Sequence, residues 1–472
     1  MTLAAQLTPE GFSPRSSARE WWGLLGISLL APAIGGAPLQ AVLGGVGGVA
    51  LIGGMLIVPT LGLHALLVAI PFAPSVTLGD GDLTIPGAEP FALLLLAVWM
   101  ARGLARGSLE FPRDGVMAAL GLLLLALILS GISAYRVQPA AKEILKWALL
   151  AFAYVFTATR VRDARLRAML VATMLFAAAG QGIEGVVQSI VGFGPPTFAI
   201  GGFMRAHGEF GQPNPFAGYL GTILPIAVMV ALTAPERRLR WIAAVAGACI
   251  GLGILFSLSR GAWLGLAVAV LAMAFAWSSR TRQALVPVVA VSVLVFALGV
   301  VGALPPTLAD RIRSVADNFG VFDARGVQPT SENFAIVERM AHWQAGWYMF
   351  REQPWQGVGA GNYPVAYEDY FLPGWKDPLG HAHNYYINMA AEAGIPGLAA
   401  LLLLLAVALS QAIANLRRSV TPGDRGLALG LLGSIVLLCT HSVFDNLLVH
   451  GVGIHLGVLL GLTASSGDAT GD

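Results

Sequence analysis

The chain has 472 residues, of which 56% are hydrophobic and only 11% are charged. Soluble domains carry about 25% charged residues. The composition therefore excludes a soluble fold and predicts an all-α polytopic membrane protein whose first partner is the lipid bilayer. The formal net charge of +2 is uninformative as a total, and we expect no nucleic-acid partner.

Apolar segments long enough to cross a bilayer recur along much of the chain. A spanning helix needs roughly 20 apolar residues. Such segments lie near residues 21–37, 39–57, 59–72, 88–102, 115–134, 144–159, 168–192, 213–233, 241–258, 261–278, 284–304, 393–414, 426–444 and 447–464. The first three are short and rich in glycine, so we predict about 12 to 14 spanning helices.

Arginine placement predicts how these helices are oriented. Several short connections are rich in arginine, and threading the spans places all of them on one side of the membrane. They contain Arg102, Arg106 and Arg113; Arg160, Arg162, Arg165 and Arg167; Arg237, Arg238 and Arg240; Arg280 and Arg282; and Arg417, Arg418 and Arg425. Because cytoplasmic loops carry an excess of basic residues, we expect this side to be cytoplasmic, together with residues 1–20 and 465–472.

One connection on the opposite, external side is long enough to form a domain. It runs from about residue 305 to 392 and separates a bundle of spans at 21–304 from the last spans at 393–464. Between Asn333 and Arg351, apolar residues recur at helical spacing. They are Ala335, Ile336, Met340, Trp343, Trp347 and Phe350. The spacing predicts an amphipathic helix that lies on the bilayer surface or caps the bundle.

Three polar clusters interrupt the apolar chain on the external side. The first runs from Arg205 to Phe216 and ends an external loop. The second is Ser257-Leu-Ser259-Arg260-Gly261, which joins two spans with almost no loop. The third runs from His381 to Gly397 and stands directly before a long apolar run. Polar groups gathered at one face of a membrane protein predict a functional site there.

Arginines on the external face break the charge bias that orients the other connections. They are Arg205, Arg260 and Arg339. A guanidinium binds phosphate through two parallel hydrogen bonds and keeps its charge when partly desolvated. We therefore expect these arginines to bind an anion, for which a lipid pyrophosphate is the natural membrane-bound form. The alternative is that each arginine caps a helix end or reaches lipid headgroups.

His383 is the candidate general base in the third cluster. A neutral imidazole can take a proton from an attacking hydroxyl near neutral pH. Asn384 beside it, or Glu392 if it faces the site, would fix the tautomer of the ring. Alternatively, His383 bonds a backbone carbonyl at a helix N-terminus. His381 is a weaker candidate on spacing alone.

Other polar and aromatic residues are expected to line the site. His441 and Asp445 stand one helical turn apart near the end of the penultimate span, where they would share a hydrogen bond or tie two helices together. The remaining candidates come from the first and third clusters: His207, Glu209, Asn214, Tyr385 and Tyr386.

Asp80-Gly81-Asp82 is the one carboxylate pair that resembles a metal site of a sugar transferase. A plain glycine turn with solvated aspartates explains it better. The chain has no phosphate-binding Gly-x-x-x-x-Gly-Lys-[Ser/Thr] loop and no His-Glu-x-x-His zinc motif. We therefore expect neither a metal nor another cofactor.

Taken together, these segments resemble the O-antigen ligase and polymerase superfamily of bacterial membrane glycosyltransferases. The matching residues are Arg205 to Phe216; Ser259-Arg260-Gly261; Arg339 to Trp343 followed by Pro354 to Asn362 with its Gly-x-Gly-x-Gly-Asn turn; and His383-Asn384 with Gly394 and Gly397 at the spacing of the ligases. They cover the chain from about 200 to 400, in order and on one membrane face.

The resemblance implies a C-type transferase fold and a donor glycan carried on undecaprenyl pyrophosphate. It implies inversion at the anomeric carbon without a metal. By carry-over, His383 is the general base on the acceptor hydroxyl, and Arg205 and Arg260 hold the pyrophosphate leaving group, with Arg339 as a third. The active site would face the periplasm from the bacterial inner membrane, and the best single prediction is an O-antigen ligase with a lipid A-core acceptor.

Two other functions share this donor, and one belongs to another class. A polysaccharide polymerase would use a second lipid-linked glycan; Arg205 and Gly221 have the spacing associated with polymerases, which is weak evidence in a chain with 58 glycines. A protein O-oligosaccharyltransferase would use a protein. A secondary transporter would place its ionisable groups near the bilayer midplane and often shows internal repeats. The one-sided polar clusters favour an enzyme.

Overall fold

The computed structural model describes residues 39–73, 76–78, 83–85, 87–200, 202–303, 321–330 and 333–465. The predicted span at 21–37 and the Asp80-Gly81-Asp82 turn lie outside these residues, as do the predicted N-terminal segment 1–20 and the tail beyond residue 465.

The chain divides into two compact units. The smaller contains Leu94–Leu109 and the chain up to Ala65, including α2 (Leu39–Ile57). In this unit, Leu63 and Leu95 are buried, and the Arg102 guanidinium donates to the carbonyl of Leu56. The larger unit contains Leu66–Leu93 and the chain from Glu110 onwards, and therefore all three polar clusters.

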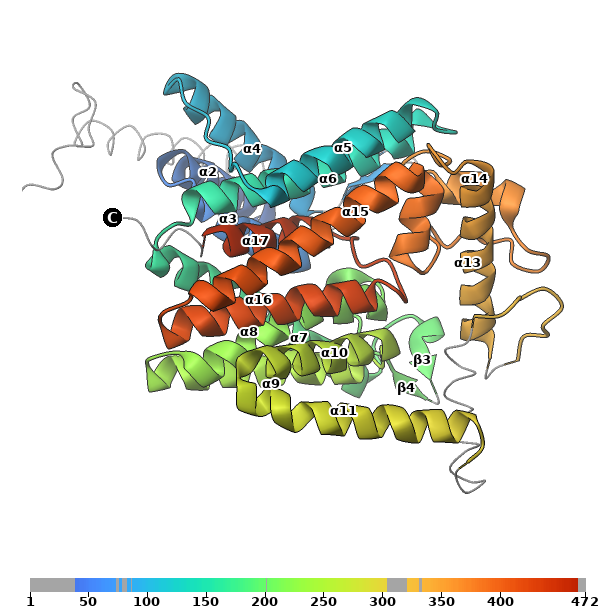
Figure 1. Ribbon diagram of the computed structural model, residues 1–472. Helices are drawn as coiled ribbons and strands as arrows, with labels where there is room; N and C mark the ends of the chain where they lie inside the picture. The colour runs from blue at the N-terminus through green and yellow to red at the C-terminus, as the bar shows by residue number, and fades with distance from the viewer. Residues whose placement is uncertain are drawn as a thin grey trace, which may run out of the picture. The chain divides into compact units, whose positions relative to one another are not determined.

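Helices make up nearly all of the described chain (Figure 1). Besides α2, they are α3 (Thr60–Phe72), α4 (Ala88–Ala105), α5 (Gly115–Ile132), α6 (Val137–Arg160), α7 (Ala164–Val191), α8 (Pro213–Thr233), α9 (Arg237–Phe256), α10 (Arg260–Trp277), α11 (Ser279–Val300), α13 (Phe334–Glu352), α14 (Tyr363–Tyr370), α15 (Tyr385–Arg418), α16 (Pro422–His441) and α17 (Val452–Ser465). Two 3-10 turns, η1 (Pro196–Phe198) and η2 (Gly208–Phe210), lie in the loop before α8.

Two small antiparallel hairpins are the strands of the described chain, and they were not predicted. One pairs β1 (Val76–Leu78) with β2 (Leu83–Ile85), and the other pairs β3 (Ala199–Ile200) with β4 (Phe203–Met204). Such short strands leave too little alternation for a period of two to be recognised.

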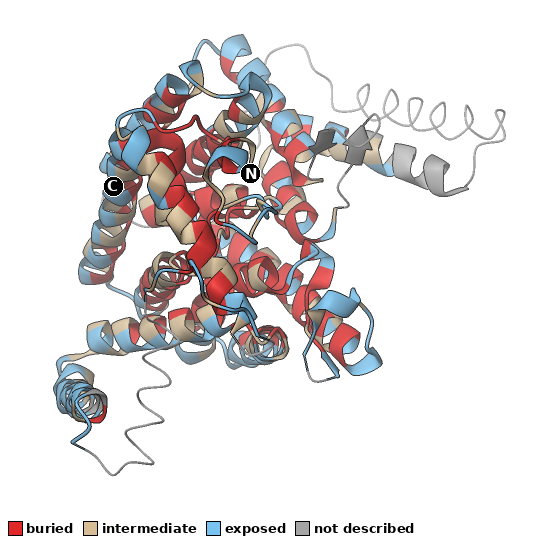
Figure 2. Ribbon diagram, turned by 90° about the vertical axis from the view of Figure 1, so that its right-hand side faces the viewer, coloured by how far each residue is buried: buried red, intermediate tan, exposed pale blue. Residues whose placement is uncertain are grey.

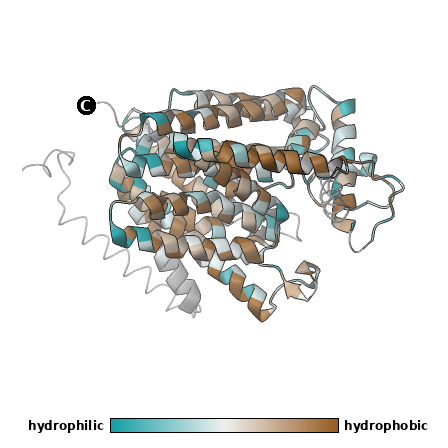
Figure 3. Ribbon diagram, turned by 60° about the horizontal axis from the view of Figure 1, so that its bottom comes forward, coloured by the Kyte–Doolittle hydropathy of each residue, from teal (hydrophilic) through white to brown (hydrophobic). Residues whose placement is uncertain are grey.

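The all-α polytopic fold is confirmed. In the described part of the chain, nine helices are long and apolar enough to cross a membrane: α4, α5, α7, α8, α9, α10, α11, α15 and α16. Hydrophobic residues run along the helices and hydrophilic residues gather at many of their ends (Figure 3). Each predicted span from 39–57 onwards coincides with a helix, and α3 and α17 are shorter apolar helices. The predicted count of about 12 to 14 requires α2, α3, α6 and α17 to cross as well.

Helices of the larger unit bury the faces that they turn toward one another (Figure 2). Helices with extensive contacts include α6 with α17, α8 with α16, and α10 with α16. Small residues allow the backbones to approach: a Cβ on Gly182 of α7 would stand 2.4 Å from the carbonyl oxygen of Cys249 on α9. Small residues at the contact are the usual basis of helix packing in membranes.

A break near its start divides α15 into two segments. Gly394 has φ 62° and ψ −161°, outside the helical region, and Pro396 follows it. A Cβ at residue 394 would lie 2.5 Å from the carbonyl oxygen of Trp355, so both the backbone angle and the space require glycine. The chain therefore enters its long apolar segment at the predicted position near 393, after a short segment that begins beside His383.

The predicted amphipathic helix is α13, which packs on α14 and on the start of α15 (Figure 1). Its buried side differs from the predicted one, because Ala335 and Trp347 are exposed. Small residues face α15 instead: a Cβ at Gly346 would meet Ile387 at 2.8 Å. In the larger unit, α13 and α14 lie at the end opposite the α8–α9 and α15–α16 connections (Figure 1).

Candidate functional site

The Asp445 carboxylate is the centre of a polar cluster drawn from all three sequence clusters. It follows the end of α16 and is 3% exposed. Its Oδ2 accepts a hydrogen bond from Asn214 Nδ2 at 2.6 Å. Its Oδ1 lies 3.5 Å from both His381 Nε2 and His383 Nδ1. A buried charge requires such partners, so Asp445 joins the first cluster to the third.

The hydrogen bonds around His381 and His383 indicate their tautomers. The backbone N–H of His383 donates to His381 Nδ1 at 3.0 Å, so the proton of a neutral His381 resides on Nε2, facing Asp445. Asp445 can only accept, so the proton of a neutral His383 resides on Nδ1. His383 Nε2 is buried and has no hydrogen-bond partner in the described chain. We infer that this nitrogen presents a free lone pair.

His383 has a backbone conformation that few side chains adopt. Its φ is 52°, in the left-handed region, which is uncommon for residues other than glycine, although asparagine, aspartate and histidine enter it more often than most. The Trp343 indole of α13 donates to the His383 carbonyl at 3.2 Å and helps to hold it. Strain of this kind persists where surrounding structure fixes it, and it is common at functional sites.

Three guanidinium groups lie near one another, and two of them, those of Arg205 and Arg339, also lie near Asp445. Arg205 donates through Nε to the Ser257 carbonyl at 2.7 Å and through Nη2 to Asn214 Oδ1 at 3.0 Å. Arg260 is the first residue of α10, and within the described residues it has no hydrogen bond or ion pair. Arg339 projects from α13, and its Nε is buried without a partner in that same part of the chain. The site therefore has free cationic donors that can receive an anion.

The charges of the three arginines and Asp445 act on one another, as the pKa values of Arg205 and Arg339 indicate. Burial lowers the pKa of Arg205; the charge of Arg260 lowers it further, and Asp445 raises it. Burial also lowers the pKa of Arg339, with Asp445 raising it and Arg260 lowering it. The three predicted arginines thus converge on one place, and their mutual repulsion favours an incoming anion.

The pKa values of Asp445 and His381 determine which of the two groups is charged at neutral pH. Burial acts to raise the pKa of Asp445, but the hydrogen bond from His383 and the nearby imidazoles hold that pKa well below its usual range. Burial lowers the pKa of His381 to about 4, despite the Asp445 charge. At neutral pH the site therefore contains an ionised Asp445 and a neutral His381.

Asn384 and Glu392 do not contact the His383 ring. Asn384 caps α15, where its Oδ1 accepts from the N–H groups of Tyr386 at 3.0 Å and Ile387 at 3.1 Å. Glu392 accepts from the N–H groups of Gly361 at 3.0 Å and Tyr363 at 3.1 Å. Glu392 thus holds the Gly-x-Gly-x-Gly-Asn turn onto α15. The carboxylate that faces His383 is Asp445.

The predicted hydrogen bond between His441 and Asp445 is absent from the described structure, because α16 ends at His441 and Asp445 is not in helical register with it. His441 Nε2 instead lies 3.5 Å from Ser259 Oγ. A Cβ on Gly261 would stand 2.7 Å from the His441 ring, so the Ser-Arg-Gly turn needs its glycine to pack on α16.

Tyr385 and Tyr386 lie in the apolar interior beside the polar cluster. The Tyr386 hydroxyl donates to the Cys439 carbonyl at 2.8 Å, and both rings line a small pocket with Trp147 and Leu448. The same Trp147 and Leu448 also line a neighbouring, mostly apolar pocket.

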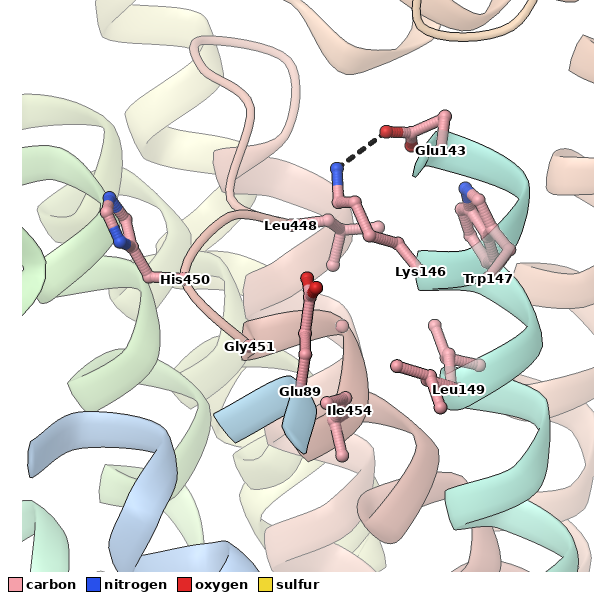
Figure 4. Close-up of a pocket in the computed structure, with 11 residues that line it drawn as sticks. Glu89, Glu143, Lys146, Trp147, Leu149, Leu448, His450, Gly451 and Ile454 are labelled. Carbon is pink, nitrogen blue, oxygen red and sulfur yellow. Dashed lines mark hydrogen bonds and ion pairs between the residues drawn. The ribbon is translucent and has the colours of Figure 1, made fainter. Parts of the chain in front are cut away.

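Charged groups stand at one side of that neighbouring pocket. Figure 4 shows Glu89 of α4 pointing into it near Lys146 of α6, whose ammonium pairs with Glu143 at 2.6 Å. His450 stands across the pocket from Trp147 (Figure 4). No contact within the described residues joins this pocket's carboxylates to Asp445.

The loop that carries Arg205 is held by two glutamines of α7. Gln188 Oε1 accepts from the N–H groups of His207 at 3.3 Å and Gly208 at 2.8 Å, while its Nε2 donates to the Gly208 carbonyl at 3.2 Å. Gln181 Oε1 accepts from the Glu209 N–H at 3.1 Å. The His207 ring bonds the Gly208 carbonyl and packs on Phe198. His207 and the exposed Glu209 are thus parts of this loop's attachment, and no contact within the described residues joins them to Asp445.

His342 and the two glutamines of α7 were missed by sequence reasoning. The His342 ring is buried, stacks on Tyr367 at 4.8 Å and meets the His383 ring edge-on at 5.4 Å. Burial lowers its pKa to about 3, and the charges of His383 and His381 add to the effect. One signal was available: His342 stands three residues after Arg339, on the same face of a predicted helix.

His381, His383 and Asp445 also have the residue types of a metal site, with their ligand atoms within 4.8 Å of one another. Two observations disfavour a cation there. The His381 nitrogen facing the centre bears the proton, as the bond from the His383 N–H indicates. Arg205 and Arg339 add positive charge near Asp445, which opposes a divalent ion.

A comparison with known protein families finds a match to part of the chain. The family model described as O-antigen ligase matches residues 243–402, which include Arg260, Arg339 and His383. Arg205, Asn214 and Asp445 lie outside the matched residues but belong to the same cluster. No curated protein matches the chain. The match confirms the resemblance seen in the sequence: within a multi-pass membrane protein, residues 243–402 are similar to the O-antigen ligase family.

Proposed function

We propose that the protein transfers a glycan from undecaprenyl pyrophosphate to an acceptor sugar hydroxyl, with inversion and without a metal. One observation supports the proposal: His383, Arg205 and Arg339 lie near one buried carboxylate, Asp445, while Arg260 lies near both arginines and His383 Nε2 is left without a partner in the described chain. A displacement at a sugar carbon needs a base on one side and a stabilised leaving group on the other. The cluster contains both.

The transfer proceeds as a single displacement. The acceptor hydroxyl oxygen attacks the anomeric carbon, and its proton passes to His383 Nε2. The bond between the anomeric carbon and the diphosphate oxygen breaks, and its electron pair leaves with undecaprenyl pyrophosphate. Asp445 keeps the Nδ1 proton of His383 in place and stabilises the imidazolium that forms, as a carboxylate does in other base dyads.

The arginines balance the charge that grows on the departing diphosphate. Arg260 and Arg339 have donors without protein partners in the described residues, and Arg205 is fixed by Ser257 and Asn214. Preorganised donors cost no reorganisation during the reaction, so their electrostatic contribution is large in a site shielded from water. Asn384 serves this chemistry indirectly, because it caps the helix that follows His383.

The site belongs on the periplasmic face of the bacterial inner membrane. Support comes from charge: Arg160, Arg237, Arg280 and Arg418 stand at helix ends near the connections opposite α13, which fits a cytoplasmic location for those connections. A secondary transporter is disfavoured, because the ionisable cluster lies at helix ends and not at the midplane.

The three candidate functions within the superfamily differ in the acceptor that receives the glycan. Our first choice is the lipid A-core, which makes the protein an O-antigen ligase; a polymerase or a protein O-oligosaccharyltransferase is the alternative. Purified protein with lipid-linked glycan should yield lipid A-core bearing the glycan when that acceptor is present. Chain extension of the lipid-linked glycan in its absence would identify a polymerase, and glycosylation of a protein would identify the third function.

Arg260→Gln is expected to weaken binding of undecaprenyl pyrophosphate on the order of tenfold to a hundredfold, since it removes a charged hydrogen-bond donor. Arg237→Gln is the matched control, because Arg237 begins the other helix of the α9–α10 hairpin, at its far end. The affinity of each variant for labelled undecaprenyl pyrophosphate is measured in a binding assay. Unchanged affinity of the Arg260 variant would show that Arg260 does not bind the diphosphate.

Gln188→Met is expected to raise the KM for the lipid-linked donor roughly tenfold, because each hydrogen bond lost from the Arg205 loop is worth about 1 kcal/mol. The kcat at saturating donor should change less. Ser189→Ala is the control, since this buried neighbour bonds only Gly185 within α7. An equal loss in the control would mean that the effect is a general weakening of α7.

A chelator is expected to leave the transfer rate unchanged. The reason is that the arginines already stabilise the leaving group and His381 directs its N–H toward Asp445. The rate is measured with and without EDTA after dialysis. If EDTA inhibited transfer and magnesium or zinc restored it, the cluster of His381, His383 and Asp445 would be a metal site.

A further inference from the structure

A polar cavity lies at the other end of the larger unit's helices, away from Asp445. It has a volume of about 280 Å³ and is formed by the segment before α5, the ends of α6 and α17, and the last turns of α15. This size is close to the lower end of about 300 Å³ for ligand pockets. Helix α15 links the two places, since it begins next to His383 and ends at Arg418.

The cavity is lined by three arginines: Arg113, Arg162 and Arg418. Arg162 pairs with Glu110 at 3.1 Å on the exposed surface. Arg113 and Arg418 have neither a hydrogen bond nor an ion pair with any residue that the structure describes. Further inside, the lining is polar and includes Thr159 and Gln411. The cavity therefore combines positive charge with hydrogen-bonding groups.

The one carboxylate that lines the cavity, Asp114, forms no ion pair with these arginines in the described chain. Both oxygens of Asp114 accept from the Tyr154 hydroxyl, at 2.6 and 2.5 Å, and Oδ1 also accepts from the Met117 N–H at 2.9 Å as the cap of α5. Asp114 therefore offsets the positive charge of the cavity only through space. An anion that entered the cavity would face two guanidinium groups without an ion-pair partner in the described chain, and such groups suit phosphate oxygens.

We propose that this cavity binds the phosphate headgroup of an anionic phospholipid. Its arginines belong to the basic connections that sequence analysis assigns to the cytoplasmic side, where basic pockets between membrane helices bind such headgroups. The lining comes from α6, α15 and α17: α17 packs on both other helices, and α15 is long and apolar enough to cross a membrane, so a lipid can present its headgroup while its chains stay in the bilayer. The phosphate itself is the recognised chemistry, and a soluble phosphate is the competing source.

The test compares lipid retention by wild type and the double variant Arg113→Gln, Arg418→Gln. Native mass spectrometry of the full chain, purified in detergent, measures bound phosphatidylglycerol and bound phosphatidylethanolamine. Wild type is expected to prefer phosphatidylglycerol, and the double variant to lose that preference by about tenfold or more, at about 1 kcal/mol per arginine near the surface. Arg417→Gln is the matched control, because this exposed neighbour does not line the cavity.

Three results would overturn the proposal. The first is equal retention of both lipids by wild type. The second is unchanged preference in the double variant, provided that its glycan transfer and unfolding temperature without lipid match wild type and so show a folded protein. The third is displacement of phosphatidylglycerol by millimolar inorganic phosphate, which would identify a soluble ligand.

Discussion

Replacing His383 with asparagine is expected to lower glycan transfer on the order of 10²- to 10⁴-fold, the usual effect of losing a general base. Asparagine is the sharpest choice, because it tolerates the left-handed backbone of this position, where φ is 52°. The fold and donor binding should survive, since the arginines that bind the diphosphate are untouched. Single-turnover transfer with bound donor measures the loss.

His450→Asn is the matched control for that experiment. His450 has φ 48°, so the same substitution meets the same backbone conformation, yet its ring lines the neighbouring pocket and does not contact Asp445. The control should transfer glycan at a rate close to wild type. Full activity of His383→Asn, or an equal loss in both variants, would remove His383 as the base.

Asp445→Asn is expected to reduce kcat by a similar factor, on the order of 10²- to 10⁴-fold. An amide at this position can donate to His383 Nδ1, which favours the tautomer with its proton on Nε2 and so blocks the lone pair that must receive the acceptor proton. The KM for the donor should change less than kcat. Steady-state kinetics over a range of donor concentrations separates the two effects.

Asp424→Asn controls for the loss of a carboxylate on the same helical segment. Asp424 lies in the first turn of α16, at the far end of the helix from Asp445, and stands 3.7 Å from Arg167. Its substitution should leave kcat close to wild type. If Asp445→Asn raised KM alone and left kcat unchanged, Asp445 would be a binding residue and not the partner of the base.

The membrane-spanning helices and several individual site residues could be predicted from the sequence. Helices α5, α8 and α10 coincide with predicted spans, because a bilayer demands long apolar segments with internally bonded backbone. Arg205, Arg260 and Arg339 were identified because arginines on the external face break the charge bias of the chain, and His383 because it is a titratable group at a membrane boundary. The structure places Arg205, Arg339 and His383 near Asp445, and Arg260 near the other two arginines.

The hydrogen-bond partners within the site could not be predicted from the sequence. Asn214 and Asp445 are 231 positions apart, and nothing local indicates that they bond. The predicted pairing of His441 with Asp445 assumed a helix that continues past residue 441, whereas the chain turns there. Asn384 and Glu392 were assigned to His383 because they are near it in sequence, but their oxygens satisfy backbone N–H groups of a helix start and a glycine turn.

Buried amides were missed for a related reason. Gln181 and Gln188 lie in an apolar helix, where a glutamine looks like a tolerated polar residue until its partner loop is known. Their hydrogen bonds hold the loop at residues 207–209, close to Arg205. Long-range contacts of this kind depend on how the helices pack, and a single sequence does not specify them.

The most direct test measures both products of one turnover by purified protein in nanodiscs. The donor is a glycan on undecaprenyl pyrophosphate, with the glycan and the diphosphate separately labelled, and the acceptor is lipid A-core. We expect one undecaprenyl pyrophosphate to be released for each glycan transferred, with inverted anomeric configuration, and almost none to be released by His383→Asn. Release of undecaprenyl monophosphate, or retention of configuration, would contradict it.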